Sequence, residues 1–210
     1  MPSRNELHKY QQRMINFIYT TPKCALWAGL GLGKTITTLT AIVDLIDSMV
    51  VSKVLIVAPL RVANSVWHVE AARWQHTKHL KFSIVTGSEK ERLAALHKTA
   101  DIYVINRENV TWIVEHYAKK WPFDMIVLDE ASSFKSSSSQ RFKSLRKTIP
   151  FTNRLVELTG TPSPNGLLDI WSQMYLLDCG ERLGRSMTAY KQRFFEAGYN
   201  GYSFKPVKSA

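Results

Sequence analysis

The sequence has little cysteine and no long hydrophobic run. Its two cysteines, Cys24 and Cys179, stand far apart and neither belongs to a CxxC pair, so neither a zinc site nor a disulfide framework is expected. Such cysteine usage is typical of a reducing cytosol, and we expect a cytoplasmic location, or the host cytoplasm if the source is viral. No stretch approaches the roughly 18 apolar residues of a membrane span, and the N-terminus has no apolar signal core. No association with a membrane is expected.

Acidic residues are also scarce relative to basic ones. The chain has 17 Asp and Glu against 28 Lys and Arg, which gives a formal net charge of +11. This excess favours polyanions such as nucleic acids as partners, although a solvated positive surface explains it equally well. The six histidines are not spaced from acidic residues or cysteines as metal ligands usually are. We therefore do not expect a metalloenzyme. With 210 residues, 45% hydrophobic, the chain has the length and composition of one folded domain.

Short apolar runs alternate with helical patterns along most of the chain. Near-continuous apolar strands with helices between them indicate an α/β fold, in which a parallel sheet carries helices on both faces. Ligands of such sheets bind at the carboxyl ends of the strands. The expected strands are 24–27, 54–58, 82–85, 102–105, 125–128 and 155–158, and the expected helices are 35–49, 63–74, 89–97, 109–118, 139–147 and 167–177.

A glycine-rich segment lies between the first of these strands and the helix that follows it. It matches the P-loop pattern except that Ala28 occupies the usual position of the first glycine. Glycines let successive backbone N–H groups point at phosphate oxygens, and the helix N-terminus adds partial positive charge. Lys34 can reach the β and γ phosphates of ATP, and the Thr35 hydroxyl can bind Mg²⁺. An ordinary glycine-rich turn is the alternative. The predicted ATP-binding residues of the loop are Ala28, Gly29, Leu30, Gly31, Leu32, Gly33, Lys34 and Thr35.

Two adjacent carboxylates, Asp129 and Glu130, follow the apolar strand 125–128. Placing two carboxylates at the end of a buried strand costs desolvation free energy unless they bind a partner. Acidic residues in solvated loops are nevertheless common. In the same sheet as a P-loop, Asp129 would hold Mg²⁺, directly or through water, and Glu130 would orient and polarise the attacking water. The predicted catalytic residues are therefore Lys34, Asp129 and Glu130.

Further segments complete an ordered series of motifs. They are Leu7-His8-Lys9-Tyr10-Gln11 before the first strand; Leu55-Ile56-Val57-Ala58-Pro59, followed by Trp67 and Glu70; Val104-Ile105-Asn106-Arg107-Glu108; Asp129-Glu130-Ala131-Ser132; and Leu158-Thr159-Gly160-Thr161-Pro162, followed by Asn165, Leu168 and Trp171. Over about residues 7–178 this order resembles the first RecA-like domain of superfamily 2 helicases, and most of all the Snf2 branch.

The resemblance implies a RecA-like P-loop NTPase domain over residues 1–178, followed by a tail, 179–210, that leads toward a second RecA-like domain. Gln11 would read the adenine. Ser132, Thr159, Gly160 and Thr161 would couple the ATP site to nucleic acid. The family's second domain supplies arginine fingers, which are worth about 10³ to 10⁵ in rate in related reactions. We therefore expect the isolated chain to bind ATP and to hydrolyse it very slowly, with a second RecA-like domain required as a partner in cis or trans.

One motif departs from the family pattern, because Ser132 stands where the family has a final His or Asp that hydrogen-bonds toward the segment 158–162. A serine hydroxyl can make such a bond but has a shorter reach. The departure puts coupling in doubt rather than nucleotide binding.

Small polar and basic residues follow several strands, and they are candidate contacts to a nucleic-acid backbone. No base-reading module is present, so binding without sequence specificity is expected. The residues leave open whether the partner is duplex or single-stranded, DNA or RNA, and the resemblance to the Snf2 branch implies duplex DNA. Trp67 and Trp171 are interpreted as core residues, and Asn200-Gly201 as a hairpin turn. The predicted nucleic-acid contacts are Arg61, Thr86, Asn106, Arg107, Thr159 and Thr161.

Three functions compete at this point. The first is a motor that hydrolyses ATP to move on nucleic acid. The second is an ATP-gated DNA-binding module without turnover of its own. The third is a P-loop kinase or metabolic NTPase, which gives no role to the segment Thr159–Pro162.

Overall fold

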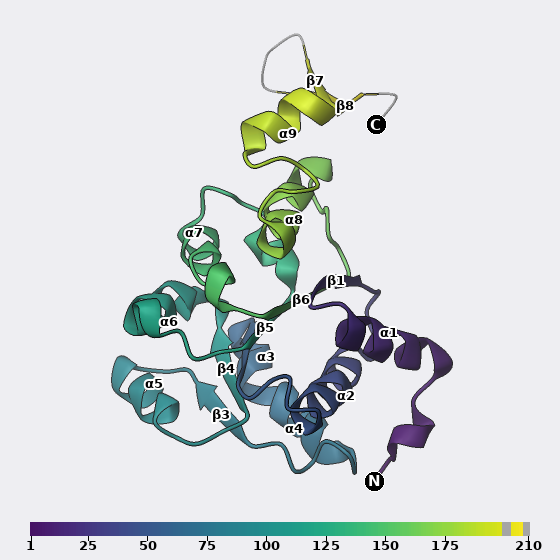
Figure 1. Ribbon diagram of the computed structural model, residues 1–210, viewed down its shortest axis with the longest axis vertical. Coiled ribbons are helices and arrows are strands. Elements are labelled where there is room, and N and C mark those ends of the chain that lie inside the picture. The colour runs from purple at the N-terminus through teal and green to yellow at the C-terminus, as the bar shows by residue number, and fades with distance from the viewer. Residues whose placement is uncertain (199–202, 208–210) are drawn as a thin grey trace.

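The computed structural model describes residues 1–198 and 203–207. Its main feature is a parallel sheet of six strands in the order β1-β6-β5-β2-β4-β3, and a separate pair, β7-β8, follows near the C-terminus (Figure 1). The strands are β1 (Lys23–Trp27), β2 (Val54–Ala58), β3 (Phe82–Val85), β4 (Ile102–Asn106), β5 (Met125–Asp129), β6 (Arg154–Thr159), β7 (Phe195–Ala197) and β8 (Phe204–Pro206).

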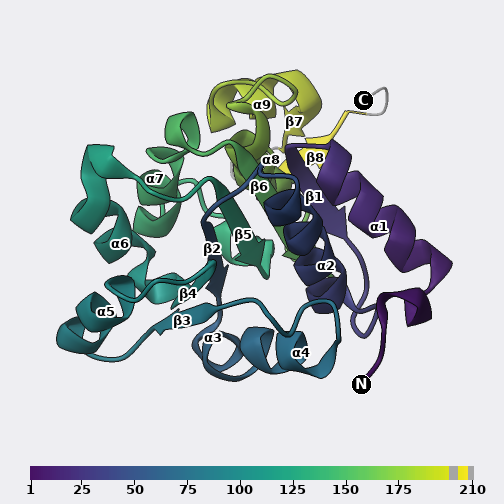
Figure 2. The ribbon, with the colours of Figure 1, turned by 60° about the horizontal axis from the view of Figure 1, so that its bottom comes forward.

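Helices cover both faces of the sheet (Figure 2). Side chains from α1 to α4 share one core with inward-facing residues of the sheet, and side chains from α5 to α9 share the other. The α-helices are α1 (Lys9–Thr20), α2 (Lys34–Asp47), α3 (Leu60–Ser65), α4 (Trp67–Arg73), α5 (Glu89–Leu96), α6 (Val110–Tyr117), α7 (Gln140–Arg146), α8 (Ile170–Asp178) and α9 (Met187–Phe194). The predicted α/β sandwich is confirmed.

Successive side chains of β5 point alternately into the two hydrophobic cores. Met125 and Val127 pack in the core under α1 to α4, whereas Ile126 and Leu128 pack in the other. Because successive side chains of a strand point to opposite faces, Asp129 falls on the α2 and α4 side. This register decides which helices the carboxylate meets.

The expected helix over 63–74 is wrong in its extent, because two short helices take its place. The chain breaks at Val66, which has φ −109° and ψ −59° and serves as the N-cap of α4. The hydroxyl of Ser65 donates to the carbonyl of Arg61 at 2.7 Å, and such back-bonding bends helices. The break starts α4 at Trp67, whose side chain is fully buried, as the sequence predicted.

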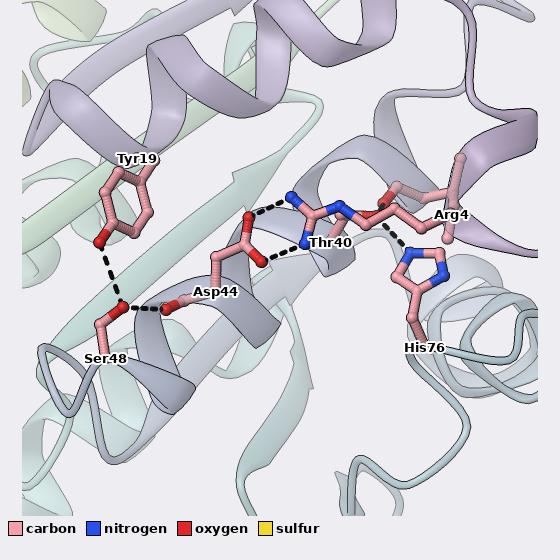
Figure 3. Close-up of polar contacts among 7 residues, drawn as sticks. Arg4, Tyr19, Thr40, Asp44, Ser48 and His76 are labelled. Carbon is pink, nitrogen blue, oxygen red and sulfur yellow. Dashed lines mark hydrogen bonds and ion pairs between the residues drawn. The ribbon is translucent and has the colours of Figure 1, made fainter.

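The N-terminal segment is tied to the far end of α2 (Figure 3). Arg4 donates twice to the Asp44 carboxylate, at 2.5 and 2.6 Å, and the Tyr19 and Ser48 hydroxyls lie 3.1 Å apart. His76, in the loop before β3, hydrogen-bonds Thr40 at 2.8 Å. The network fastens α1 and this loop to α2 at a distance from the glycine-rich segment.

Two helices outside the expected set lie at the ends of the chain, α1 before β1 and α9 after α8. Tyr190 of α9 is buried and its hydroxyl donates to the carbonyl of Leu167 at 3.0 Å, so α9 is attached to the main body. Phe195 is also buried. The expected turn at Asn200-Gly201 lies outside the described residues. Within the described part of the chain, no helix combines the length and apolarity that crossing a bilayer requires.

Candidate active site

The glycine-rich loop joins β1 to α2, the context that a phosphate-binding loop requires. Gly31 and Gly33 have φ of +77° and +73°, a left-handed conformation that side-chain-bearing residues rarely adopt. Gly33 is the N-cap of α2. The ammonium of Lys34 donates to the carbonyls of Ala28 and Gly29 at 2.7 and 2.8 Å, so the lysine lies across the loop.

Gln11 lies against this loop although it comes from α1. A Cβ placed on Gly33 would overlap the Nε2 atom of Gln11. The other end of the amide is fixed, because Gln11 Oε1 accepts a hydrogen bond from the backbone N–H of His8 at 2.8 Å. Gln11 is 6% exposed. Its predicted contact with the nucleotide base is therefore consistent with a site beside the loop, and it stays a prediction.

Asp129 ends β5 on the face that carries α2. Its Oδ2 accepts a hydrogen bond from Nε1 of Trp67 at 2.9 Å. Burial raises the pKa of Asp129, and the charge of Glu130 raises it as well, while the Trp67 hydrogen bond and the charge of Lys34 oppose the shift. The P-loop and the acidic pair therefore lie at the same end of the parallel sheet, where β1 and β5 both end.

Glu130 adopts a left-handed conformation, with φ 60° and ψ 60°, which turns the chain sharply after β5. Its Oε1 accepts from the hydroxyl of Ser132 at 2.9 Å and from that of Thr159 at 2.8 Å. The backbone N–H of Thr161 donates to the Thr159 hydroxyl at 3.1 Å. Ser132 therefore approaches the segment 158–162 through Glu130, and the serine's short reach is sufficient for that arrangement.

The segment after β6 is also joined to the P-loop by its backbone. Trp27 of β1 pairs with Thr159 of β6, and the N–H of Ala28 donates to the Thr159 carbonyl at 3.2 Å. A Cβ on Gly160 would lie 3.5 Å from the Ala28 carbonyl oxygen. The sheet thus places the loop, the acidic pair and the residues 159–161 at one edge.

Two predicted nucleic-acid contacts need correction. Thr159 is fully buried, and its hydroxyl is bonded within the site. Asn106 is 6% exposed, and its amide bonds Glu108 at 3.0 Å and Asn109 at 2.6 Å. Because a phosphate contact requires an accessible polar group, neither side chain is a direct contact in this arrangement.

The other predicted contacts remain accessible. Arg61 and Thr161 are exposed. Thr86 bonds Asn64 at 2.8 Å, and Arg107 pairs with Glu108 at 3.0 Å. All four follow strand ends at the edge of the sheet that carries the P-loop, so they lie on the side where contact with a nucleic acid is expected.

The site offers few protein ligands for Mg²⁺ by itself. Within residues 1–198 and 203–207, no group of three or more His, Cys, Asp or Glu residues could hold a metal ion. Mg²⁺ is commonly held by one or two protein oxygens together with substrate phosphates, and the Thr35 hydroxyl and the Asp129 carboxylate are such oxygens. The glycine cradle and these two donors fit a magnesium nucleotide.

The sequence did not predict the hydrogen bond from Trp67 to Asp129 in the site. The two residues are far apart in sequence and meet only because α4 packs on the face of the sheet to which Asp129 points. The available signal was chemical: a buried indole usually finds a hydrogen-bond acceptor.

A P-loop after β1 and an Asp-Glu pair at the end of β5, with β6 between the two strands, define a RecA-like ATP-binding domain. The sequence profile of the SNF2-related domain matches residues 10–196, and the chain belongs to this family. It is 41% identical over 194 residues to protein p41 of Acyrthosiphon pisum secondary endosymbiont phage 1, covering 89% of this chain and 42% of that protein. It is 30% identical over 196 residues to the DNA excision repair protein ERCC-6-like of Mus musculus, covering 87% of this chain and 15% of that protein.

Two solved structures share the fold. The Sulfolobus solfataricus SWI2/SNF2 ATPase core in complex with dsDNA has a TM-score of 0.75 at 24% identity, covering 90% of this chain and 39% of that chain. The SWI2/SNF2 ATPase core domain from the same organism has a TM-score of 0.67 at 25% identity, covering 90% and 38%. The chain thus spans about two fifths, or less, of the length of the relatives described here.

Proposed function

We propose that this chain is the ATP-binding half of a DNA-dependent ATPase, a helicase or duplex DNA translocase that turns over when a second RecA-like domain completes the site. The observation that carries the proposal is the convergence of Lys34, Asp129 and Glu130 at one edge of the sheet. The charge of Lys34 acts on the Asp129 carboxylate, and Glu130 is held by two hydroxyl donors. Membership of the SNF2-related family supports this class of activity.

Each site residue has a chemical role in the proposal. The N–H groups of the loop 28–35 bind the phosphates, and Lys34 exchanges its bonds to the Ala28 and Gly29 carbonyls for phosphate oxygens. Thr35 and Asp129 would hold Mg²⁺, which when bound neutralises charge that develops on the phosphates. Glu130 orients the attacking water, and Gln11 reads the adenine.

The bonds around Glu130 give the proposed coupling a physical route. Thr159 donates to Glu130 through its side chain and accepts from the Thr161 backbone. A displacement of the exposed Thr161 by a nucleic acid would therefore change the position of the carboxylate that orients water. Ser132 donates to the same oxygen and limits how far that carboxylate can turn.

Duplex DNA is the proposed partner. The net charge of +11 favours a polyanion, and the fold matches an ATPase core solved with double-stranded DNA. Arg61, Thr86, Arg107 and Thr161 would contact the backbone without reading sequence. The cytoplasmic location expected from the cysteine usage belongs to the same proposal.

A second candidate is an ATP-gated DNA-binding module without turnover of its own. One observation favours it: within the described residues, no arginine hydrogen-bonds or forms an ion pair with Asp129 or Glu130. Arginines that neutralise the transferred phosphoryl group contribute about 10³ to 10⁵ in rate. Without them the site would bind ATP and hydrolyse it slowly.

The two candidates are separated by measuring ATP binding and hydrolysis by the 210-residue chain, with and without duplex DNA. Lys34→Ala removes the phosphate ligand, and Lys98→Ala, an exposed lysine at the end of α5, is the matched control. Binding that requires Lys34, with slow hydrolysis that rises when a second RecA-like domain is added in trans, supports the motor. Binding with persistent inactivity supports the gated module, and no binding refutes both.

A further inference from the structure

A fully buried tryptophan contacts the proposed magnesium ligand directly. Nε1 of Trp67 donates to Oδ2 of Asp129 at 2.9 Å, and Trp67 has no solvent exposure. Trp67 is the first residue of α4, a helix in contact with α2. The indole therefore approaches Asp129 from the helix layer that also carries the P-loop lysine.

The contact constrains the carboxylate in two ways. The indole N–H is a donor only, so it occupies one oxygen of Asp129 and leaves the other for a metal ion or its bound water. Trp67 is fully buried and belongs to the core cluster that lies under α1 to α4, so the donor cannot follow the carboxylate if it rotates. A carboxylate held by a rigid donor keeps one orientation toward the P-loop.

We propose that Trp67 is a positioning residue for Mg²⁺: its indole N–H fixes the rotamer of Asp129, so that the other carboxylate oxygen would stay available to the Mg²⁺ that Asp129 and Thr35 would hold. The inference rests on the proposed function, because it concerns the same site. It assigns a role in metal binding to a residue that the sequence presents only as part of the core.

Loss of the Trp67 donor should affect ATP binding in the presence of Mg²⁺ and leave metal-free ATP binding unchanged. Residues that orient metal ligands typically contribute about 10- to 100-fold in metal affinity. Loss of the indole donor should therefore weaken the response of ATP binding to Mg²⁺ by about tenfold. Binding of ATP without metal should not change, because among the described residues Trp67 makes its side-chain hydrogen bond to Asp129 and none to the loop 28–35.

The test substitutes Trp67→Phe, which keeps an aromatic ring in the core and removes the donor. The matched control is Trp74→Phe. Trp74 Nε1 also donates to a carboxylate, Glu70 Oε1, at 3.0 Å, but Glu70 is not part of the site. Both substitutions remove one indole-carboxylate bond beside the same helix, and only one of them touches Asp129.

The measurement is the dissociation constant of a fluorescent ATP analogue, taken in EDTA and over a series of Mg²⁺ concentrations. Trp67→Phe should shift the Mg²⁺ midpoint about tenfold upward at unchanged affinity in EDTA, and Trp74→Phe should leave both values as in the wild type. In an Asp129→Asn background, Trp67→Phe should add no further shift, because two residues that act through one contact are not additive.

A second measurement uses the wild-type chain, so the proposal stays testable if Trp67→Phe does not fold. In a ¹⁵N-labelled sample, the indole resonance that moves in Asp129→Asn belongs to Trp67. At fixed ATP this resonance should shift when Mg²⁺ is added, and a resonance that stays in place overturns the proposal. An unchanged Mg²⁺ midpoint in Trp67→Phe also overturns it.

Failure of this inference differs from failure of the proposed function. If the wild type binds the nucleotide and Lys34→Ala does not, the proposed site stands whatever Trp67→Phe shows. If the wild type fails to bind the nucleotide at any Mg²⁺ concentration, the proposed function itself is wrong.

Discussion

Glu157 is a carboxylic acid in the interior of β6, and replacing it should stabilise the protein. It has no solvent exposure, and neither carboxyl oxygen has a hydrogen-bond partner among the described residues. Its neighbours across the sheet are Ala25 of β1 and Leu128 of β5. Burial raises the pKa of Glu157 well above its usual value, so the folded protein holds it as a neutral acid.

Two terms make this acid unfavourable. A buried polar group without a partner costs about 1–3 kcal/mol. The second term depends on pH. Below the unfolded-state pKa of about 4.3, both states are protonated and there is no penalty. Above it, the unfolded chain releases the proton and the folded chain retains it, which costs about 1.4 kcal/mol per pH unit until the raised pKa is reached. Stability is therefore lost as pH rises.

The test compares the wild type with Glu157→Gln and Glu157→Leu by thermal unfolding, followed by circular dichroism at pH 5, 6, 7 and 8. A chain of this size shifts its Tm by about 2–4 °C per kcal/mol. Between the unfolded-state pKa and the raised pKa of Glu157, the Tm of the wild type should therefore fall relative to that of Glu157→Gln by about 3–6 °C for each pH unit. Glu157→Leu removes the polar group as well and should be the most stable at every pH. Glu115→Gln, at an exposed position of α6, is the matched control.

Parallel pH profiles for the wild type and Glu157→Gln would refute this reasoning, because they would mean that the carboxyl ionises in the folded state as it does in the unfolded chain. A loss of stability in both variants would instead show that the acid has a stabilising partner.

Four further outcomes follow from the structure. Gln11→Ala should reduce the preference for ATP over GTP about tenfold, the worth of one hydrogen bond, in competition binding; an unchanged preference would place the base elsewhere. With a second RecA-like domain added in trans, Thr159→Val should leave ATP binding intact and lower DNA-stimulated hydrolysis about tenfold, and equal loss of both would contradict the coupling role. Ser88→Ala removes the side-chain cap of α5 and should cost about 1 kcal/mol, seen as a lower Tm. Burial raises the pKa of Cys24 to about 11, so iodoacetamide should modify the exposed Cys179 and spare Cys24 until unfolding, as mass spectrometry would show.

The strands were predictable because each is a compact run of β-branched and apolar residues that a two-sided sheet requires. For example, Val54–Ala58 is buried throughout. The break at Val66 was not predictable from periodicity, because both α3 and α4 follow one helical pattern and only their packing separates them. α1 was missed because its buried stripe includes the polar Gln11.

In the site, too, the contiguous motifs were predictable from the sequence and the contacts between different elements were not. The P-loop and the pair Asp129-Glu130 are contiguous in sequence, so their local pattern identified them. The bonds of Asp129 to Trp67 and of Glu130 to Thr159 join different elements, and they depend on the order of strands and the placement of α4. Burial of Thr159 likewise follows from the position of β6 between β1 and β5 in the sheet, which residue type alone does not indicate.

The hydrogen bond from the Ala28 N–H to the Thr159 carbonyl has a mechanical consequence. β1 and β6 are parallel neighbours in register up to Trp27 and Thr159, and this bond extends the ladder by one more step. The phosphate loop and the segment 159–161 therefore cannot slide past each other without breaking the end of the ladder. A force on either segment therefore displaces the ends of both strands together. A displacement of Thr161 would change the curvature of the phosphate loop.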